Sequence, residues 1–286
     1  MTASVEVVTW TRQLVALRVF RQVAEALAES GIRVLPVKGI VTARRLYDDI
    51  AERPMTDIDL RIAPTNFRDL LRVGTARGWN PDSSGPRLFE AVMTVDGWNV
   101  EVECTLGPPG LCSLGVNDIL QRASTLVEPF GFAHFEPELH DHALILALNA
   151  FKDGLRQAPW ALEDLRRVVR ASRFDATSLV KRAHTGKVLS ALWIVANWMV
   201  DAHKAQEWMV VRDLIGAYPP SRRVECAYQW TARRGWSPKI GLLVVGSSND
   251  DAWQATAGLG LTALGVAHGR LQRTLERTLS PRLRAR

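Results

Sequence analysis

In the first third of the chain, apolar residues recur every three or four positions in some segments, as in helices, and every second position in others, as in strands. Over residues 11–30 apolar side chains recur at intervals of three and four, which predicts an amphipathic helix that stops at Gly31. Residues 32–37 predict a short strand, and Lys38-Gly39 begins a helix that runs to about Tyr47. The chain therefore opens with helix, strand, glycine turn and helix.

Further segments complete a predicted sheet. Residues 53–62 alternate polar and apolar side chains as a strand does, and residues 67–77 predict a helix. Asp96-Gly97 is typical of a two-residue hairpin turn, so Arg87 to Val95 should pair antiparallel with Trp98 to Leu106. Helices that alternate with strands, followed by a hairpin, predict an α/β (α+β) fold with a mixed sheet and flanking helices.

Only helical periodicity follows Glu138. The segments with apolar spacing near three and four are residues 139–155, 161–171, 178–183, 188–202 and 206–215. Pro219-Pro220 interrupts the pattern, and the glycine-containing region up to Arg286 predicts no definite element. We therefore expect a first domain over residues 1–138 and an all-helical domain over residues 139–286.

The strand within residues 53–62 carries the first sign of chemistry. Successive side chains of a strand point to opposite faces, so Asp57, Asp59 and Arg61 share one face and the apolar residues between them share the other. Two carboxylates about 7 Å apart on one face can bind hard divalent cations such as Mg²⁺. An Asp-x-Asp pattern on a solvated strand face is also common without any function. The surrounding sequence must therefore decide whether this pattern is functional.

A second acidic strand supplies that context. Asn99, Glu101 and Glu103 share one face of the strand that follows the hairpin turn. Carboxylates on two strands of one sheet can converge on a single site. Such a cluster suits phosphoryl or nucleotidyl transfer, in which divalent metal ions bind the phosphates.

The Lys38-Gly39 turn stands eighteen residues before Asp57, between a strand and a helix. A glycine there lets the backbone come close to a phosphate, and the N-terminus of the following helix attracts anionic oxygens. Lys38 would add a positive charge.

These features together resemble a known family. The residues that carry the resemblance are Leu35-Pro36-Val37-Lys38-Gly39-Ile40, Tyr47, Arg53-Pro54-Met55-Thr56-Asp57-Ile58-Asp59-Leu60, Gly78 and Glu101-Val102-Glu103, and more weakly Lys152 and Asp164. Over about residues 30–170 the chain resembles the uncharacterised bacterial nucleotidyltransferases of the DNA polymerase β-like superfamily.

The chain departs from the wider pattern in two places. The wider superfamily usually has Gly-Ser where this chain has Lys38-Gly39, although the subfamily it resembles has Lys-Gly. That subfamily more often carries Asp-Leu-His at Glu101-Val102-Glu103, which aligns Glu101 with the metal ligand and Glu103 with the histidine.

The resemblance implies a nucleotidyltransferase that depends on Mg²⁺ or Mn²⁺. Such an enzyme transfers a nucleoside monophosphate from a nucleoside triphosphate (NTP), ATP among the candidates, to an acceptor hydroxyl on a small molecule, a protein or RNA. The resemblance places Asp57, Asp59 and Glu101 at the metal ions and in catalysis. The residues it places near the nucleotide phosphates are Lys38, Gly39, Arg53 and Lys152, with Asp164 a weaker candidate site residue.

Two alternatives stay open at this point. One is a catalytically inactive relative that binds a nucleotide or a partner protein. The other is a toxin-like nucleotidyltransferase whose acceptor is tRNA.

The net charge of +6 divides unevenly along the chain. Residues 1–138 carry 14 Lys and Arg against 18 Asp and Glu, whereas residues 139–286 carry 22 against 12. Bound metal would offset the acids of the first part, and the basic second part would suit a polyphosphate or an RNA backbone. The same excess of arginine also arises when basic residues simply solvate helices.

The cysteine, histidine and hydropathy patterns exclude several other classes of protein. The three cysteines include no Cys-x-x-Cys pair, which favours a reducing cytoplasm over a disulfide framework or a zinc cluster. His140-Asp141-His142 predicts a polar helix start rather than a metal clamp, because helical residues two apart point about 200° apart. No secretory signal is visible, and the longest apolar run, residues 255–267, is shorter than the ~20 residues that a membrane span needs.

Overall fold

A four-stranded mixed sheet forms the framework of the first half of the chain. The computed structural model describes residues 5–83, 90–127, 131–155, 159–216, 218, 221–234, 244–265 and 267. The strands are β1 (Val34–Val37), β2 (Ile58–Ile62), β3 (Glu90–Val95) and β4 (Trp98–Glu103), in the order β1-β2-β4-β3. β2 runs parallel to β4 and antiparallel to β1. The N-terminal ends of β2 and β4, the two inner strands, therefore lie at the same end of the sheet.

The hairpin between β3 and β4 is the one that the Asp96-Gly97 turn predicts. Both turn residues have positive φ, 48° and 79°, as a two-residue hairpin turn of this kind requires. The turn fixes the register, which pairs Val95 with Trp98 and Glu90 with Glu103.

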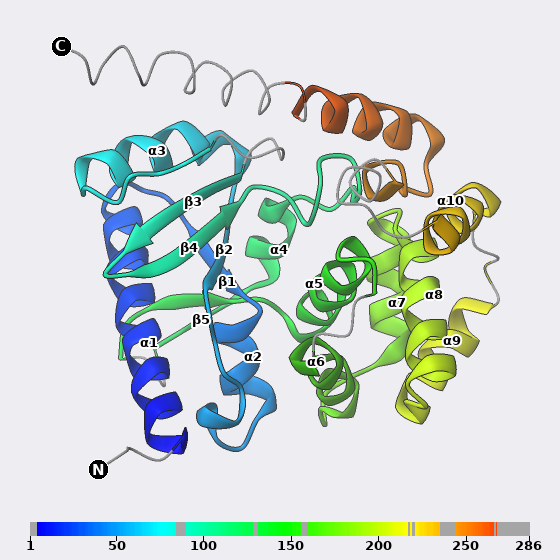
Figure 1. Cartoon of the computed structure of the whole chain (residues 1–286), viewed down its shortest axis with the longest axis horizontal. Coiled ribbons are helices and arrows are strands. Elements are labelled where there is room, and N and C mark those ends of the chain that lie inside the picture. The colour runs from blue at the N-terminus through cyan, green and yellow to red at the C-terminus, as the bar shows by residue number, and fades with distance from the viewer. Residues whose placement is uncertain are drawn as a thin grey trace.

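One face of the sheet is covered by helices α1 (Val5–Glu29) and α3 (Phe67–Ala76) (Figure 1). The apolar side chains of β2 belong to this layer, and they are fully buried with Phe20 and Leu27 of α1 and Leu70 of α3. The helical periodicity of residues 11–30 and 67–77 therefore predicted the layer correctly.

The opposite, polar face of β2 is also covered. The elements nearest to it are α2 (Gly39–Leu46) and α4 (Val116–Arg122). Asp59 and Arg61 are 4% and 2% exposed, so the face that alternation assigns to polar residues is not a solvated surface. Its charges must be compensated inside the protein, since an unpaired buried charge is very costly.

Several short elements were not predicted from the sequence. They are the 3₁₀ turn Ile50–Glu52, helix α4, and a separate two-stranded sheet of β5 (Ser124–Leu126) and β6 (His134–Glu136), whereas the 3₁₀ turn Pro64–Asn66 lies where the sequence predicts a turn before α3. Each spans seven residues or fewer, which is too short for a hydrophobic period to stand out.

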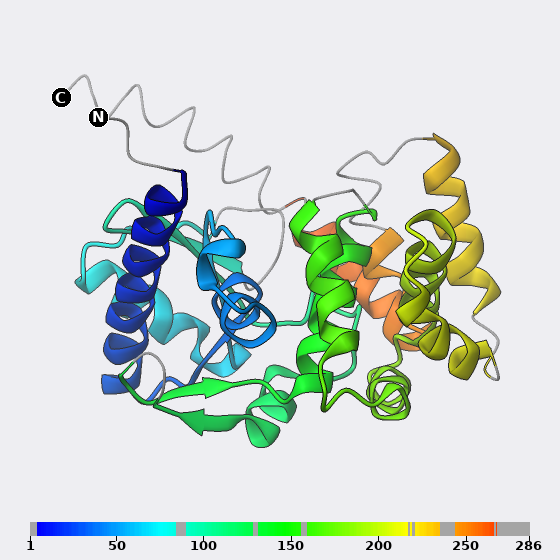
Figure 2. The ribbon, with the colours of Figure 1, turned by 90° about the horizontal axis from the view of Figure 1, so that it is seen from below.

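The second half is helical, as predicted, and lies beside the sheet part (Figure 1, Figure 2). Its helices are α5 (Leu139–Lys152), α6 (Pro159–Arg170), α7 (Ala176–Thr185), α8 (Leu189–Asn197), α9 (Met209–Gly216) and α10 (Arg222–Arg234), followed by a helix over residues 252–265. The helix predicted over 188–202 ends in a π-helical turn, Trp198–Ala202, which directly continues α8. A 3₁₀ turn, Gln206–Trp208, precedes α9. α10 and the helix at 252–265 were not predicted.

The two halves share part of their apolar core. Leu35 and Val37 of β1 belong to the same buried cluster as Phe151, Leu165 and Trp208 of the helical half. The division at residue 138 stays a prediction. Among the described residues, no helix is long and apolar enough to span a bilayer.

Candidate active site

The turn after β1 holds Lys38 in an unusual backbone conformation. Its φ of 52° and ψ of −128° lie in a region that glycine enters easily and other residues rarely enter. A strained residue of this kind persists only where the surrounding structure holds it in place.

Gly39 is required here by close packing against the segment that precedes the aspartates. A Cβ atom on Gly39 would lie 2.8 Å from Cγ and 3.1 Å from Sδ of Met55, whose side chain is 4% exposed. The absence of a side chain at Gly39 therefore lets residues 53–57 lie against α2. Its predicted contact with phosphate stays a prediction.

Three carboxylates come together where β2 and β4 begin. Asp57 directly precedes β2, Asp59 lies within it, and the parallel register places Glu101 of β4 beside Asp59. Asp57 and Glu101 are partly buried, whereas Asp59 is almost fully buried. Asp59 and Glu101 therefore share one face of the sheet, and Asp57 lies near enough to act on both electrostatically.

The pKa values of two of these acids reflect the crowding. Burial raises the pKa of Asp57, and the Asp59 carboxylate raises it further, while Lys38 and the hydroxyl of Thr56 act in the opposite direction. Burial and Asp59 likewise raise the pKa of Glu101. Carboxylates with raised pKa values in one cluster are typical of functional sites.

Lys38 supplies positive charge to this cluster. Its Nζ donates a hydrogen bond to Asp59 Oδ1, and the side chains are only 16% and 5% exposed. Burial lowers the pKa of Lys38, but Asp59 and Glu103 outweigh that effect and leave the pKa above its ordinary value. Lys38 is therefore an ammonium ion at neutral pH.

Glu103 has different partners from Glu101, although both lie on the same face of β4. Its carboxylate lies 3.1 Å from Nη2 of Arg61 and 3.0 Å from Nζ of Lys152, and all three side chains are nearly inaccessible. Lys152 comes from α5, so the helical half neutralises a charge on the sheet. The predicted contact of Lys152 with phosphate stays a prediction, and in this structure Lys152 binds Glu103.

Glu90 is an acid that the sequence analysis missed. It lies opposite Glu103 in the hairpin, and carboxylate oxygens of Glu90, Glu101 and Glu103 lie within 4.8 Å of one another. The Asp96-Gly97 turn fixes this register, so counting residues back from the turn would have placed Glu90 at the site.

Arg53 is held by a carboxylate of the helical half. Its guanidinium makes three hydrogen bonds of 2.9–3.1 Å to Asp164 of α6, and the hydroxyl of Tyr47 donates to the same carboxylate at 2.7 Å. Asp164 is 2% exposed. This contact fastens the segment before Asp57 to α6. The phosphate contact of Arg53 stays a prediction, and in this structure its side chain binds Asp164.

The histidine pair at the start of α5 binds separate partners. His142 is fully buried with Nε2 3.2 Å from the hydroxyl of Thr42, and burial lowers its pKa well below the ordinary value. Nε2 of His140 instead accepts a hydrogen bond from the backbone of Asp175. Asp141 between them accepts two hydrogen bonds of 2.8 Å from Arg122. The three residues do begin a helix, but Asp141 and His142 are buried rather than solvated.

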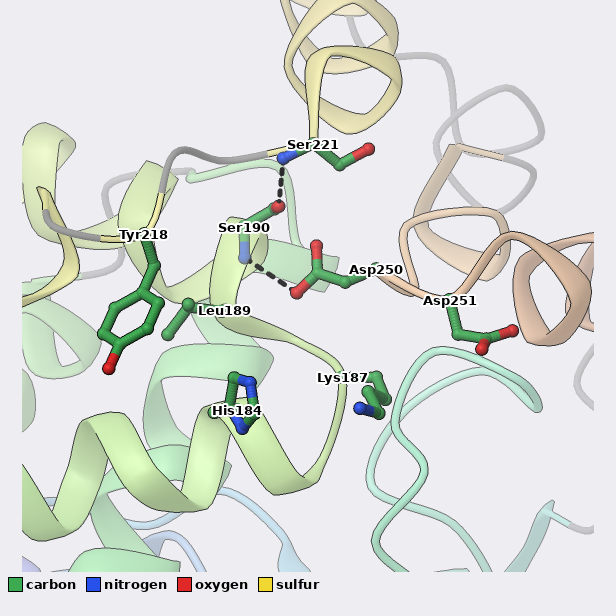
Figure 3. Close-up of a pocket in the computed structure, with 8 residues that line it drawn as sticks. All are labelled: His184, Lys187, Leu189, Ser190, Tyr218, Ser221, Asp250 and Asp251. Carbon is green, nitrogen blue, oxygen red and sulfur yellow. Dashed lines mark hydrogen bonds between the residues drawn. The ribbon is translucent and has the colours of Figure 1, made fainter.

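A cavity of about 440 Å³ lies within the helical half, apart from the carboxylate cluster (Figure 3). Its lining residues are His184, Lys187, Leu189, Ser190, Tyr218, Ser221, Asp250 and Asp251. Asp250 accepts a hydrogen bond from the backbone of Ser190, whose hydroxyl accepts one from the backbone of Ser221. None of the residues predicted from the sequence as site residues lines this cavity.

Comparison with known families agrees with the fold. Residues 5–200 match a family described as uncharacterised nucleotidyltransferases, and the chain belongs to this family. The match includes the whole sheet and continues through α8, so it crosses the predicted division at residue 138. No curated protein matches the chain. Membership supports a nucleotidyl transfer activity in general, with a nucleotide as substrate.

The Gly39 contact predicts a specific rescue. Gly39→Ala should destabilise the protein because the new methyl group overlaps Met55, and Met55→Ala should destabilise it by leaving a cavity. In the double variant the nearest Met55 atom would be its Cβ at 3.8 Å, an ordinary contact. Urea unfolding should therefore show a coupling of about 0.5 kcal/mol or more in favour of the double variant. Additive effects would contradict this role for Gly39.

Asp164 should contribute far more to stability than an exposed aspartate of the same half. Asp164→Asn leaves the buried Arg53 guanidinium without its counter-charge, so urea unfolding should show a loss of about 2–3 kcal/mol. The control is Asp213→Asn, since Asp213 is 66% exposed and 3.5 Å from Arg212, which predicts a change below about 0.5 kcal/mol. Equal losses in the two variants would contradict the anchoring role.

Proposed function

We propose that the protein catalyses metal-dependent transfer of a nucleoside monophosphate from an NTP to an acceptor hydroxyl, with pyrophosphate as the leaving group. The observation that carries this proposal is the juxtaposition of Asp57, Asp59 and Glu101 where two parallel strands begin. Membership of a nucleotidyltransferase family agrees with it.

The donor atoms of the cluster suit Mg²⁺ or Mn²⁺. Both are hard cations that prefer carboxylate oxygens, and partly buried Asp57 and Glu101 keep some access from solvent. Asp57, Asp59 and Glu101 would hold the metal. When bound, it would neutralise the triphosphate and stabilise the entering and leaving oxygens.

The remaining residues have roles that follow from their charge and position. Lys38 follows Val37, which pairs with Asp59, and its ammonium group lies on the Asp59 carboxylate, where it can also bind a phosphate oxygen. The pKa of Glu101 is raised towards neutral pH, and a base with such a pKa is suited to accept the proton of the acceptor hydroxyl.

The acceptor is not defined by the positive charge of the helical half. Several arginines there are engaged within the protein: Arg166 with the His203 carbonyl, Arg167 with Glu163 and Glu52, Arg170 with Glu207, Arg182 with Asp141, Arg212 with Asp201 and Arg223 with the carbonyls of Ser247 and Asn249. The charge of these six arginines is therefore partly used within the protein, and among the described residues it does not by itself favour RNA over a small molecule or a protein as acceptor.

The experiment that tests the proposed function uses the purified full-length chain. Each α-labelled NTP is incubated with Mg²⁺ or Mn²⁺, with and without cell extract, and pyrophosphate release and labelled products are measured. We expect label to be transferred to one class of acceptor. Nucleotide binding without transfer to any acceptor would instead identify an inactive relative, and labelled tRNA would identify the toxin-like alternative.

Asn substitutions at the two aspartates should separate activity from stability. Asp57→Asn and Asp59→Asn should each lower transfer by about 10³-fold or more, because each removes a metal ligand. Asp59→Asn should also lower the melting temperature, since the buried Lys38 ammonium loses its charged partner. Full activity of either variant at saturating Mg²⁺ would contradict the catalytic assignment.

Asp57→Asn should instead raise the melting temperature of the metal-free protein at neutral pH. The pKa of Asp57 is raised in the folded state, so its contribution to stability is present at low pH and is lost as pH rises through that pKa. The variant should therefore exceed the wild type at pH 7.5, and the difference should vanish below about pH 4. A difference that grows on acidification would contradict the raised pKa.

Glu101 and Glu103 should respond differently to replacement by glutamine. Glu101→Gln should lower turnover by about 10²-fold or more without loss of stability. Glu103→Gln should affect turnover less but lower the melting temperature, because Arg61 and Lys152 lose their shared counter-charge. The reverse pattern would mean that Glu103 is the metal ligand.

A further inference from the structure

The ammonium group of Lys38 lies on the carboxylate that the proposed function assigns to a metal ion. Lys38 Nζ donates to Asp59 Oδ1 in a contact with little exposure to solvent. Lys38 also acts electrostatically on the other two proposed ligands, because it lowers the pKa values of both Asp57 and Glu101 against the larger effect of burial. One cation thus serves all three carboxylates.

The other nearby cations are committed elsewhere. Arg61 and Lys152 both pair with Glu103, and Arg53 pairs with Asp164. In the part of the chain that the structure describes, Lys38 is therefore the side chain that directly contacts the Asp59 carboxylate with a positive charge.

The strained backbone at Lys38 indicates that the surrounding structure holds this residue in its position. A glycine would adopt φ 52° and ψ −128° without strain, yet the chain carries a long cationic side chain there. The flexible four-carbon stem of a lysine allows its charge to move between neighbouring anions without any movement of the backbone.

We propose that Lys38 is an internal counter-ion that occupies the cation position of the metal-free site, and that nucleotide binding transfers its ammonium group from Asp59 to the triphosphate. The divalent metal ion and the nucleotide then bind cooperatively, because the nucleotide removes the charge that competes with the metal for Asp59. This inference rests on the proposed function and adds a regulatory step at the same site. Without nucleotide the divalent metal ion binds weakly, so the nucleotide-free enzyme does not retain it.

The test measures Mn²⁺ binding rather than turnover. The affinity of the full-length chain for Mn²⁺ is determined by electron paramagnetic resonance, with and without a non-hydrolysable α,β-methylene analogue of the accepted NTP. For the wild type we expect the analogue to tighten Mn²⁺ binding about tenfold or more. Lys38→Met should bind Mn²⁺ about tenfold more tightly than the wild type without nucleotide, and the analogue should add little.

Two further variants make the comparison specific. Lys38→Gly also removes the charge and relieves the backbone, so it should behave like Lys38→Met even if the methionine variant folds poorly. Lys152→Met removes the same charge from the same buried network, but from Glu103 instead of Asp59. It should retain the nucleotide dependence of the wild type.

The outcomes separate the inference from the proposed function. Unchanged or weaker Mn²⁺ binding in both Lys38 variants would overturn the counter-ion role, and so would an equal gain in Lys152→Met. Asp59→Asn is the control for the site itself. If it binds Mn²⁺ as well as the wild type with the analogue present, the proposed metal site fails, whatever the Lys38 variants show.

Discussion

Compensation of buried charge on the polar face of β2 is the constraint on which the rest of the structure depends. Asp59, Arg61 and Glu103 are almost completely inaccessible to solvent, and such groups are tolerated only when they are paired. Arg61 and Lys152 neutralise Glu103, and Lys38 neutralises Asp59. The helical half is therefore part of the site, because α5 contributes Lys152 and α6 contributes the carboxylate that holds Arg53.

The same constraint explains where chemistry can take place. Glu103 and Asp164 have full sets of protein partners and serve as anchors. Asp57 and Glu101 are less buried, and their raised pKa values mark carboxylates whose negative charge the protein only partly offsets. A divalent cation would complete the charge compensation, so Asp57 and Glu101 are the acids suited to binding it.

Local patterns in the sequence predicted the sheet well. Alternation predicted one face for Asp57 and Asp59, and the Asp96-Gly97 turn predicted the β3–β4 hairpin. The parallel pairing of β2 with β4, which brings Glu101 beside Asp59, was not predicted from the sequence. Long-range partners could not be predicted in this way. Lys152 and Glu103 are 49 residues apart and Arg53 and Asp164 are 111 apart, and no periodicity links such pairs. The packing of Gly39 against Met55 is likewise visible only in three dimensions.

The most direct test of the account is a crystal structure with Mn²⁺ and a non-hydrolysable NTP analogue, in which anomalous scattering locates the metal. The account predicts a metal peak within about 2.0–2.3 Å of carboxylate oxygens of Asp57, Asp59 and Glu101. A peak held by Glu90, Glu101 and Glu103, whose carboxylate oxygens lie within 4.8 Å of one another, would contradict it. So would a nucleotide bound with its triphosphate away from β2 and β4.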